Sequence, residues 1–299
     1  MNSTAGMSSR QTWWGVQCPD FLPSAPLHIP DEWAQAADHV RRQEIRRALV
    51  LGARDVGKST FCRFLTDAGL QAGRSTALLD TDVGQKIVGP PACVTMSDSQ
   101  GLSLAFVGTT NPVRGWRRLM EGMHRLVQRT DADCLVVNTS GLLAGSGRRL
   151  KAAKIEELQP DLLIVLGEDP GLEAITGDQS ALPVLRLPSS PGARRKTDGE
   201  RRAARREAFR TYFAGARILR LKRGMVQSME ADALPAGLLV GLSDGAVDLG
   251  LGLLVAIDDT TLEVLSPVAR RGIRRVIPSL LRLDEHFSEV PAPGRPQGP

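Results

Sequence analysis

The segment from residue 52 to residue 60 restricts the fold of this chain more than any other feature. It reads Gly-Ala-Arg-Asp-Val-Gly-Lys-Ser-Thr and satisfies the pattern G-x-x-x-x-G-K-[ST]. An apolar run at 48–51 precedes it, and a helical pattern from 58 to about 68 follows it. A glycine-rich turn between a buried strand and a helix is the context in which this pattern binds phosphates. We therefore predict a P-loop, since a chance match in a glycine-rich turn would seldom have both flanks.

The residues of the predicted loop have separate tasks. Glycine at positions 52 and 57 lets backbone amides turn inward toward phosphates, and the positive end of the following helix points at them. Lys58 is expected to reach the β- and γ-phosphates, and the Ser59 hydroxyl to bind Mg²⁺. The residues predicted to bind the nucleotide are Gly52, Asp55, Val56, Gly57, Lys58, Ser59 and Thr60.

Strand and helix patterns alternate through the first two thirds of the chain. Helical patterns at 29–47, 115–129 and 148–157 are interspersed with short apolar runs typical of buried parallel strands. This order predicts an α/β fold, a P-loop NTPase core with a mainly parallel sheet flanked by helices. The predicted strands after the P-loop are 76–79, 103–107, 134–137, 162–166 and 184–187.

The pattern changes near residue 216. From there, β-like runs are separated by Gly, Asp and Pro, which predicts a small β-rich C-terminal domain. The β-like runs are 218–221, 238–242, 249–257, 261–265 and 273–277. The predicted divisions are a flexible lead-in at 1–28, a P-loop domain at 29–215, the β-rich domain at 216–285 and a disordered Pro-rich tail at 286–299.

The net charge comes from one segment. The chain has 38 basic and 33 acidic residues and a net charge of +5. Residues 192–206 hold seven basic and two acidic residues, which leaves 31 of each sign elsewhere (38 less 7, and 33 less 2). The overall charge therefore does not indicate a general nucleic-acid-binding surface.

Composition excludes several other classes of protein. With 42% hydrophobic and 24% charged residues, the 299-residue chain is typical of a globular protein. Its four cysteines are scattered without a CxxC pair, which argues against a zinc site or a disulfide framework. No run of 18 apolar residues predicts a membrane span, and the N-terminus has no secretory signal pattern, so a cytoplasmic location is expected.

A second acidic strand end narrows the reaction class. Residues 80–85 read Asp-Thr-Asp-Val-Gly-Gln directly after a predicted strand. A carboxylate at the tip of a strand beside a P-loop handles Mg²⁺ and the attacking group, and two of them can divide those tasks. The other interpretation is an Asp-rich turn. The chain has neither the N-K-x-D string of GTPases nor the second P-loop lysine of ParA-like ATPases.

With these segments in place, the chain resembles the polynucleotide 5′-hydroxyl kinase family. This family includes the RNA kinases of pre-mRNA cleavage, tRNA splicing and ribosomal RNA processing. The resemblance covers residues 29–215 in the family's order, and the C-terminal β region fits more weakly. The matching segments are 52–60, 80–85, Val-Gly-Thr-Thr-Asn-Pro at 107–112, Asn-Thr-Ser-Gly at 138–141 continuing to Gly-Ser-Gly at 145–147, and a basic stretch ending in Arg-Thr-Tyr-Phe-Ala-Gly at 210–215.

The resemblance implies roles for these residues. Asp82 would be the general base that takes the proton of a 5′-hydroxyl, Asp80 would assist with magnesium-bound water, and Gln85 would orient the phosphate or the metal shell. The implied metal residues are Ser59, Asp80 and Asp82. The implied substrate residues are Gln85, Thr109 and Thr110 beside the γ-phosphate, and Thr139 and Gly141 in a clasp at 138–141 that holds the first nucleotides.

One residue departs from the family pattern. Many members place a Trp directly after the clasp glycine for base stacking, and this chain has Leu142. Stacking on an aromatic face contributes about 1–3 kcal/mol per base. Its loss predicts a looser grip on the substrate or a changed preference between RNA and DNA.

The basic stretch corresponds to the family's lid, here residues 192–210. A guanidinium group is planar, always charged and bidentate toward phosphate, which suits phosphoryl transfer. Arg201, Arg202, Arg205 and Arg206 recur at i, i+4 spacing, and the other interpretation is a solvated helix face. For a lid, neutralising all four should damage turnover more than oligonucleotide binding. The implied catalytic residues are Lys58, Asp80, Asp82, Arg201, Arg202 and Arg205.

The function implied is ATP- and Mg²⁺-dependent transfer of the γ-phosphate to the 5′-hydroxyl of RNA or DNA. The implied partners are single-stranded or 5′-hydroxyl-ended nucleic acid and RNA-processing proteins. Two alternatives stay open. One is an ATP-binding scaffold with little transfer activity, and the other is a P-loop kinase or GTPase that acts on a different substrate.

Overall fold

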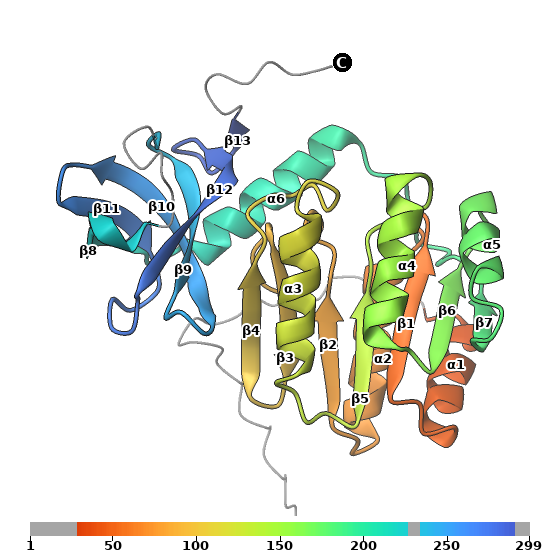
Figure 1. Cartoon of the computed structure of the whole chain (residues 1–299). Coiled ribbons are helices and arrows are strands. Elements are labelled where there is room, and N and C mark those ends of the chain that lie inside the picture. The colour runs from red at the N-terminus through yellow and green to blue at the C-terminus, as the bar shows by residue number, and fades with distance from the viewer. Residues whose placement is uncertain (1–28, 227–233, 291–299) are drawn as a thin grey trace, which may run out of the picture.

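The computed structural model describes residues 29–226 and 234–290. They form an α/β fold in which one continuous twisted sheet has helices on both faces (Figure 1). The predicted lead-in at 1–28 and residues 291–299 of the predicted tail lie outside the described residues. Within the described ranges, no helix combines the length and the apolar character that a membrane crossing requires.

The centre of the sheet consists of five parallel strands in the order β2-β5-β1-β6-β7. Each of the inner strands is apolar along almost its whole length because helices cover both of its faces. These strands are β1 (Arg47–Gly52), β2 (Thr76–Asp80), β5 (Cys134–Asn138), β6 (Leu162–Leu166) and β7 (Val184–Leu187).

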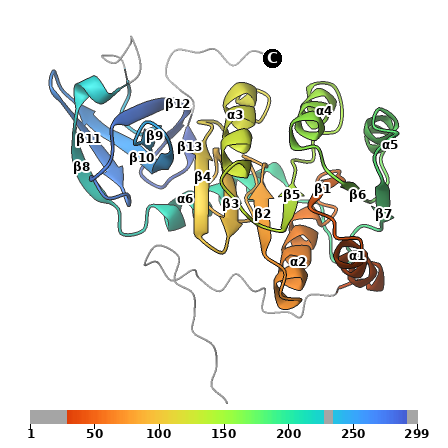
Figure 2. The same ribbon diagram turned by 60° about the horizontal axis from the view of Figure 1, so that its bottom comes forward.

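Alternate residues of β1 face the two helical layers. Ala48 and Val50 belong to one buried cluster together with Trp33 and Phe61, and Leu49 belongs to the cluster on the opposite face. This alternation follows from the two-residue period of a strand. Helices α1 (Asp31–Arg42) and α2 (Lys58–Gln71) cover the first face, and α3 (Trp116–Val127), α4 (Ser146–Leu158) and α5 (Pro170–Gly177) cover the second (Figure 2).

The sheet continues beyond β2 with antiparallel strands. β3 (Cys93–Asp98) and β4 (Gly101–Phe106) follow β2, and β10 pairs with β4. The Asp248 carboxylate fixes this junction, because it accepts from the Phe106 amide at 2.9 Å and from Arg125 at 3.0 Å. The C-terminal elements are β8 (Arg217–Lys222), a 3-10 turn (Arg223–Met225), β9 (Leu238–Ser243), β10 (Asp248–Ile257), β11 (Thr261–Ser266), β12 (Arg275–Leu283) and β13 (Glu289–Val290).

The predicted fold class is confirmed, including the β-rich C-terminal region, and three elements are additional. β3 and α5 had no prediction, although Asp169 caps α5 by accepting from the Gly171 amide at 2.8 Å and Pro170 occupies its first turn. β13 contradicts the tail prediction for residues 286–290. Its pairing with β12 satisfies its backbone groups, and such a long-range contact has no local sequence signal.

Helix α6 (Asp198–Tyr212) joins the parallel core to the C-terminal strands (Figure 1). A capping box begins it, in which Thr197 accepts from the Glu200 amide and the Glu200 side chain accepts from the Thr197 amide. At its other end, Phe209 and Phe213 pack in a buried cluster with residues of β4, β9 and β10. The helix therefore has a polar end at the P-loop side and an apolar anchor in the C-terminal region.

Candidate phosphate-binding and catalytic site

The P-loop connects β1 to α2 as predicted. Gly57 adopts a left-handed conformation with φ of 95°, which only glycine adopts readily. A Cβ atom at Gly52 would lie 2.8 Å from Val56 Cγ2, and one at Gly57 would lie 2.8 Å from Ser190 Cβ. Both glycines are therefore required by the tight course of the loop, whose amides face the carboxyl ends of the strands.

Lys58 begins α2 and is 7% exposed. Its Nζ donates to the Ala53 carbonyl oxygen at 2.5 Å. Burial lowers the pKa of Lys58 to about 8, while the negative charge of Asp82 acts to raise it. The P-loop lysine and the proposed base therefore lie within one electrostatic environment. Ser59, next in the helix, is exposed at the mouth of the loop.

Asp80 is fully buried and its carboxylate is saturated. Oδ1 accepts from the Asn138 amide group at 2.9 Å and from the Asp82 backbone amide at 3.1 Å. Oδ2 accepts from the Ile87 amide at 2.6 Å and lies 3.2 Å from Lys86 Nζ. Because these contacts occupy its lone-pair directions, Asp80 is placed to orient the following loop. The structure does not favour the predicted role at magnesium-bound water.

Asp82 lies in the turn after β2 and is half-buried. Its Oδ1 accepts from the Gly84 amide at 2.9 Å and from the Gln85 amide at 3.1 Å, which fixes the direction of the carboxylate. A Cβ atom at Gly84 would lie 3.0 Å from the Thr110 carbonyl oxygen, so the 107–112 segment touches this turn. Thr109 is buried and accepts from the Asn111 amide at 3.2 Å.

The predicted clasp at 138–141 lies against the P-loop. A Cβ atom at Gly141 would lie 2.6 Å from the Arg54 amide nitrogen, so only glycine fits there. Thr139 is different from its prediction, because its side chain is fully buried and donates to the Val50 carbonyl oxygen at 2.7 Å. Thr139 thus ties the clasp to β1 and does not face a substrate.

Two buried lysines of α4 reach this region without any prediction. Lys151 Nζ donates to the Ser140 carbonyl oxygen at 2.6 Å, and Lys154 Nζ donates to the Thr81 hydroxyl at 2.8 Å. Burial lowers the pKa of Lys151 well below its ordinary value and that of Lys154 to about 7. A sequence signal existed, because only six of the 38 basic residues are lysines. The lysines are Lys58, Lys86, Lys151, Lys154, Lys196 and Lys222.

The lid helix α6 divides its arginines between separate tasks. Arg201 forms an ion pair with Asp55 of the P-loop, and its carbonyl oxygen accepts from the Gln85 amide group at 3.2 Å. Arg205 instead binds Glu289 of β13 through two contacts of 2.6 and 2.9 Å. Arg202 is exposed. Of the three arginines predicted to be catalytic, the structure brings only Arg201 to the P-loop.

The remaining acidic and hydroxyl groups fit a magnesium ion held mainly by phosphates and water. Among the described residues, no group of three or more His, Cys, Asp or Glu side chains is arranged to hold a metal. Asp82 Oδ2 has no hydrogen bond in its turn, and the Ser59 hydroxyl is exposed. Mg²⁺ in nucleotide sites takes one or two protein ligands, so this donor set is sufficient.

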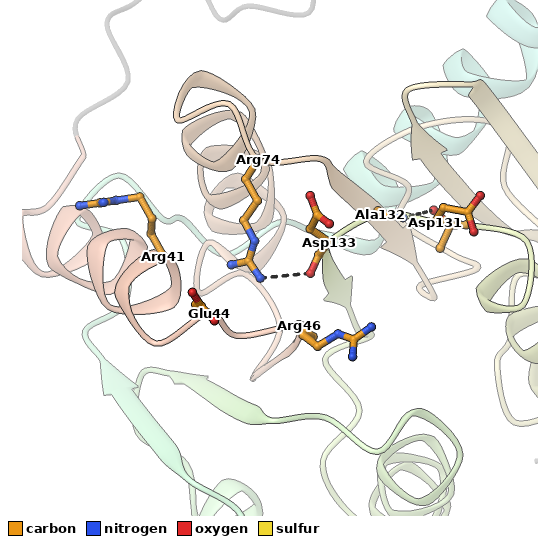
Figure 3. Close-up of a pocket in the computed structure, with 8 residues that line it drawn as sticks. Arg41, Glu44, Arg46, Arg74, Asp131, Ala132 and Asp133 are labelled. Carbon is orange, nitrogen blue, oxygen red and sulfur yellow. Dashed lines mark hydrogen bonds between the residues drawn. The ribbon is translucent and has the colours of Figure 1, made fainter.

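Two hollows flank the sheet at opposite ends of its strands. One of about 380 Å³ lies beside the P-loop, between the start of α1 and residues 188–191. The other, of about 700 Å³, lies at the amino ends of β1, β2 and β5, where Arg74 donates to the Asp133 carbonyl oxygen at 3.1 Å (Figure 3). Open α/β sheets bind ligands at the carboxyl ends of their strands, so only the first hollow adjoins the site.

Known proteins share this arrangement. The chain is 26% identical to a polyribonucleotide 5′-hydroxyl-kinase of Methanocaldococcus jannaschii, over 88% of this chain and 94% of that protein. It is 34% identical to the corresponding kinase of Thermococcus kodakarensis over 57% of this chain, a match that spans about half (52%) of that relative's length.

Solved structures and a family model agree with these relatives. The fold is similar to that of Clp1p in complex with Pcf11p, with a TM-score of 0.69, 14% identity and coverage of 89% of this chain and 84% of that one. A second Clp1p–Pcf11p complex gives 0.67, at 15% identity and coverage of 86% and 80%. The model of the family described as "mRNA cleavage and polyadenylation factor CLP1 P-loop" matches residues 52–215, more than half of the chain. The chain therefore belongs to the CLP1 P-loop family.

Proposed function

We propose that this protein is an ATP-dependent polyribonucleotide 5′-hydroxyl kinase. The observation that carries the proposal is the meeting of three segments at one end of the sheet. The P-loop contacts the clasp at Gly141, and the turn that holds Asp82 contacts Thr110. The charge of Asp82 in turn acts on Lys58. The names of the archaeal relatives support the substrate class.

The arrangement suits in-line phosphoryl transfer. Asp82 would take the proton of the 5′-hydroxyl as its oxygen bonds to the γ-phosphorus of ATP, while the bond from that phosphorus to the β-γ bridging oxygen breaks and ADP leaves. Lys58 would turn from the Ala53 carbonyl oxygen to the phosphates. Arg201, already at the P-loop, would neutralise charge on the transferred group. These residue roles are proposals.

Ser59 and Asp82 would hold a magnesium ion in this proposal. When bound, Mg²⁺ neutralises charge on the β- and γ-phosphates. Asp80 would act through the turn, because its Oδ1 holds the Asp82 amide. Gln85, whose amide group donates to the Arg201 carbonyl oxygen, would connect that turn to the lid.

The proposed setting is the cytoplasm, with RNA-processing proteins as partners. The support for partners is that the two solved Clp1p structures hold Pcf11p. Because those likenesses rest on the fold, Pcf11p itself is not proposed for this chain. Cell fractionation, and co-purification of RNA-processing proteins with the tagged chain, test this setting.

Phosphate transfer to defined oligonucleotides tests the function directly. The protein is incubated with γ-labelled ATP, Mg²⁺ and matched RNA and DNA oligonucleotides that end in a 5′-hydroxyl, with 5′-phosphorylated oligonucleotides as controls. Label on the 5′-hydroxyl RNA alone, or on RNA more than on DNA, is expected. ATP binding without transfer to any oligonucleotide would contradict the proposal and favour the scaffold alternative.

A further inference from the structure

Two lysines of α4 hold the two loops that carry the proposed chemistry. Lys154 Nζ binds both the hydroxyl (2.8 Å) and the carbonyl oxygen (3.2 Å) of Thr81, the residue before Asp82. Lys151 Nζ binds both the carbonyl oxygen (2.6 Å) and the hydroxyl (3.2 Å) of Ser140, the residue before Gly141. The same pattern of contacts is thus repeated one helical turn apart.

The placement of these lysines is costly for the fold. Both side chains are fully buried, and the groups that they bind are neutral oxygens. Burying an ammonium group without a directly bound carboxylate is unfavourable, and an apolar residue would serve the packing of a helix against a sheet better. A structural role alone therefore does not account for two lysines at consecutive turns.

The contacts restrict movement between the two loops. Thr81 is bound from two sides, because its amide and hydroxyl also donate to the Asn138 carbonyl oxygen at 3.1 and 2.6 Å. Asn138 ends β5 and Thr81 follows β2, and these strands are adjacent and parallel. Lys151 holds the chain two residues after Asn138. Helix α4 thus fixes the turn of Asp82 and the clasp of Gly141 relative to each other.

We propose that Lys151 and Lys154 are positioning residues for the transfer reaction: Lys154 sets the place of the base Asp82, and Lys151 sets the place of the clasp at Gly141. This inference rests on the proposed function. It divides the labour between two residues three positions apart on one helix. Loss of Lys154 should affect the chemical step, and loss of Lys151 should affect the grip on the oligonucleotide.

The test uses Lys154→Met and Lys151→Met, because methionine keeps an unbranched stem of similar length and removes the donor. Steady-state transfer is measured against both ATP and a 5′-hydroxyl RNA. Lys154→Met is expected to lower kcat by about 100-fold, the scale of a reacting group displaced by about 1 Å, with the KM for RNA little changed. Lys151→Met is expected to raise the KM for RNA at least tenfold.

The controls separate a lost position from a lost fold. Circular dichroism and the Kd for ATP should match the wild type in both variants, because neither lysine contacts the P-loop directly. Lys222→Met on β8, an exposed lysine, should leave all constants unchanged. If Lys154→Met does not fold, Thr81→Val takes its place, since it removes the hydroxyl that Lys154 binds.

Two failures are distinguishable. No transfer by the wild type would overturn the proposed function. A wild type that transfers phosphate, together with folded variants whose kcat and KM change equally or not at all, would overturn the positioning roles alone. A KM effect from Lys154→Met with a kcat effect from Lys151→Met would also overturn the assignment.

Discussion

Helices α4 and α6 both bring cations to the same end of the sheet, but in opposite ways. The lysines of α4 are buried and bind neutral oxygens, and burial lowers their pKa. The inward arginines of α6 are partly exposed and bind carboxylates, Arg201 at Asp55 and Arg205 at Glu289. A buried lysine with neutral partners acts as a fixed donor, whereas an arginine held by a carboxylate keeps its charge and can exchange partners.

The difference separates a rigid wall of the site from a movable one. α4 packs in the central core through Leu150, Ile155 and Leu158. α6 buries only Phe209 along its fifteen residues and is otherwise held by charged and polar contacts. Ion pairs at partly exposed positions contribute little to stability, so α6 is the part that can open.

The largest effect is expected at the residue that the α4 side positions. Asp82→Asn keeps the side-chain shape but removes the base, so kcat should fall by about 10³-fold, within the range of general base catalysis. Single-turnover transfer from labelled ATP measures it. The Kd for ATP serves as the control, and turnover close to wild type would show that another group takes the proton.

On the α6 side, Arg201→Gln should lower kcat by about 100-fold, similar to the loss of one transition-state donor. Arg205→Gln should lower it much less, because its guanidinium is occupied by Glu289. Oligonucleotide binding, followed by fluorescence anisotropy, should change little in either variant. Collapse of binding with kcat preserved at saturation would make this stretch a docking surface instead of a lid.

The contrast in burial predicts a pH effect on stability. The pKa of Lys154 is about 7 in the folded protein and 10.5 ordinarily. Between these values the unfolded chain binds a proton that the folded chain does not, so stability rises with pH. Relative to Lys154→Met, the free energy of unfolding of the wild type should rise by about 1.4 kcal/mol per pH unit from pH 7 to pH 10, and stay level below pH 7.

Urea unfolding of both proteins at pH 6, 7, 8 and 9 measures this difference. Lys222→Met is carried through the same series, because its side chain reaches solvent in the folded protein as well. A difference between the wild type and Lys154→Met that does not change with pH would mean that Lys154 is not held in a buried site.

The smallest effect is expected at the anchor of the lid. Glu289→Gln removes the carboxylate that holds Arg205 and should loosen the end of α6 near β13. Only a few-fold change in kcat is expected, because partly exposed ion pairs contribute about 1 kcal/mol or less. Faster hydrogen exchange in α6, with α4 unchanged, would support the contrast between the helices. Equal loosening of α4 would contradict it.

The parallel core and the positions of the site segments were predictable because their signals are local. β6 and β7 lie at their predicted residues, and the P-loop joins a strand to a helix as its pattern requires. Asp82, Gly141 and Thr110 could be placed at one end of the sheet because each follows a strand of the predicted fold. Strand ends meet at the same edge wherever the strands are parallel or the antiparallel neighbour returns there.

The remaining part of the site depends on contacts between distant residues. Lys154 meets Thr81 across 73 positions, and Arg205 meets Glu289 across 84. No helical period distinguishes Lys154 from a solvated lysine, and no pattern shows that Asp80 is saturated and Thr139 turned inward. The pairing of β10 with β4 likewise joins regions that differ in composition.

The sequence by itself determined the phosphate-binding loop, the order of the site segments and the fold class, since glycine geometry and strand periodicity act over a few residues. The tertiary structure alone decided which cations are buried, which carboxylates are free and which arginine reaches the P-loop. The physical reason is that burial and charge pairing depend on the neighbours that packing supplies, and most of those neighbours lie far away along the chain.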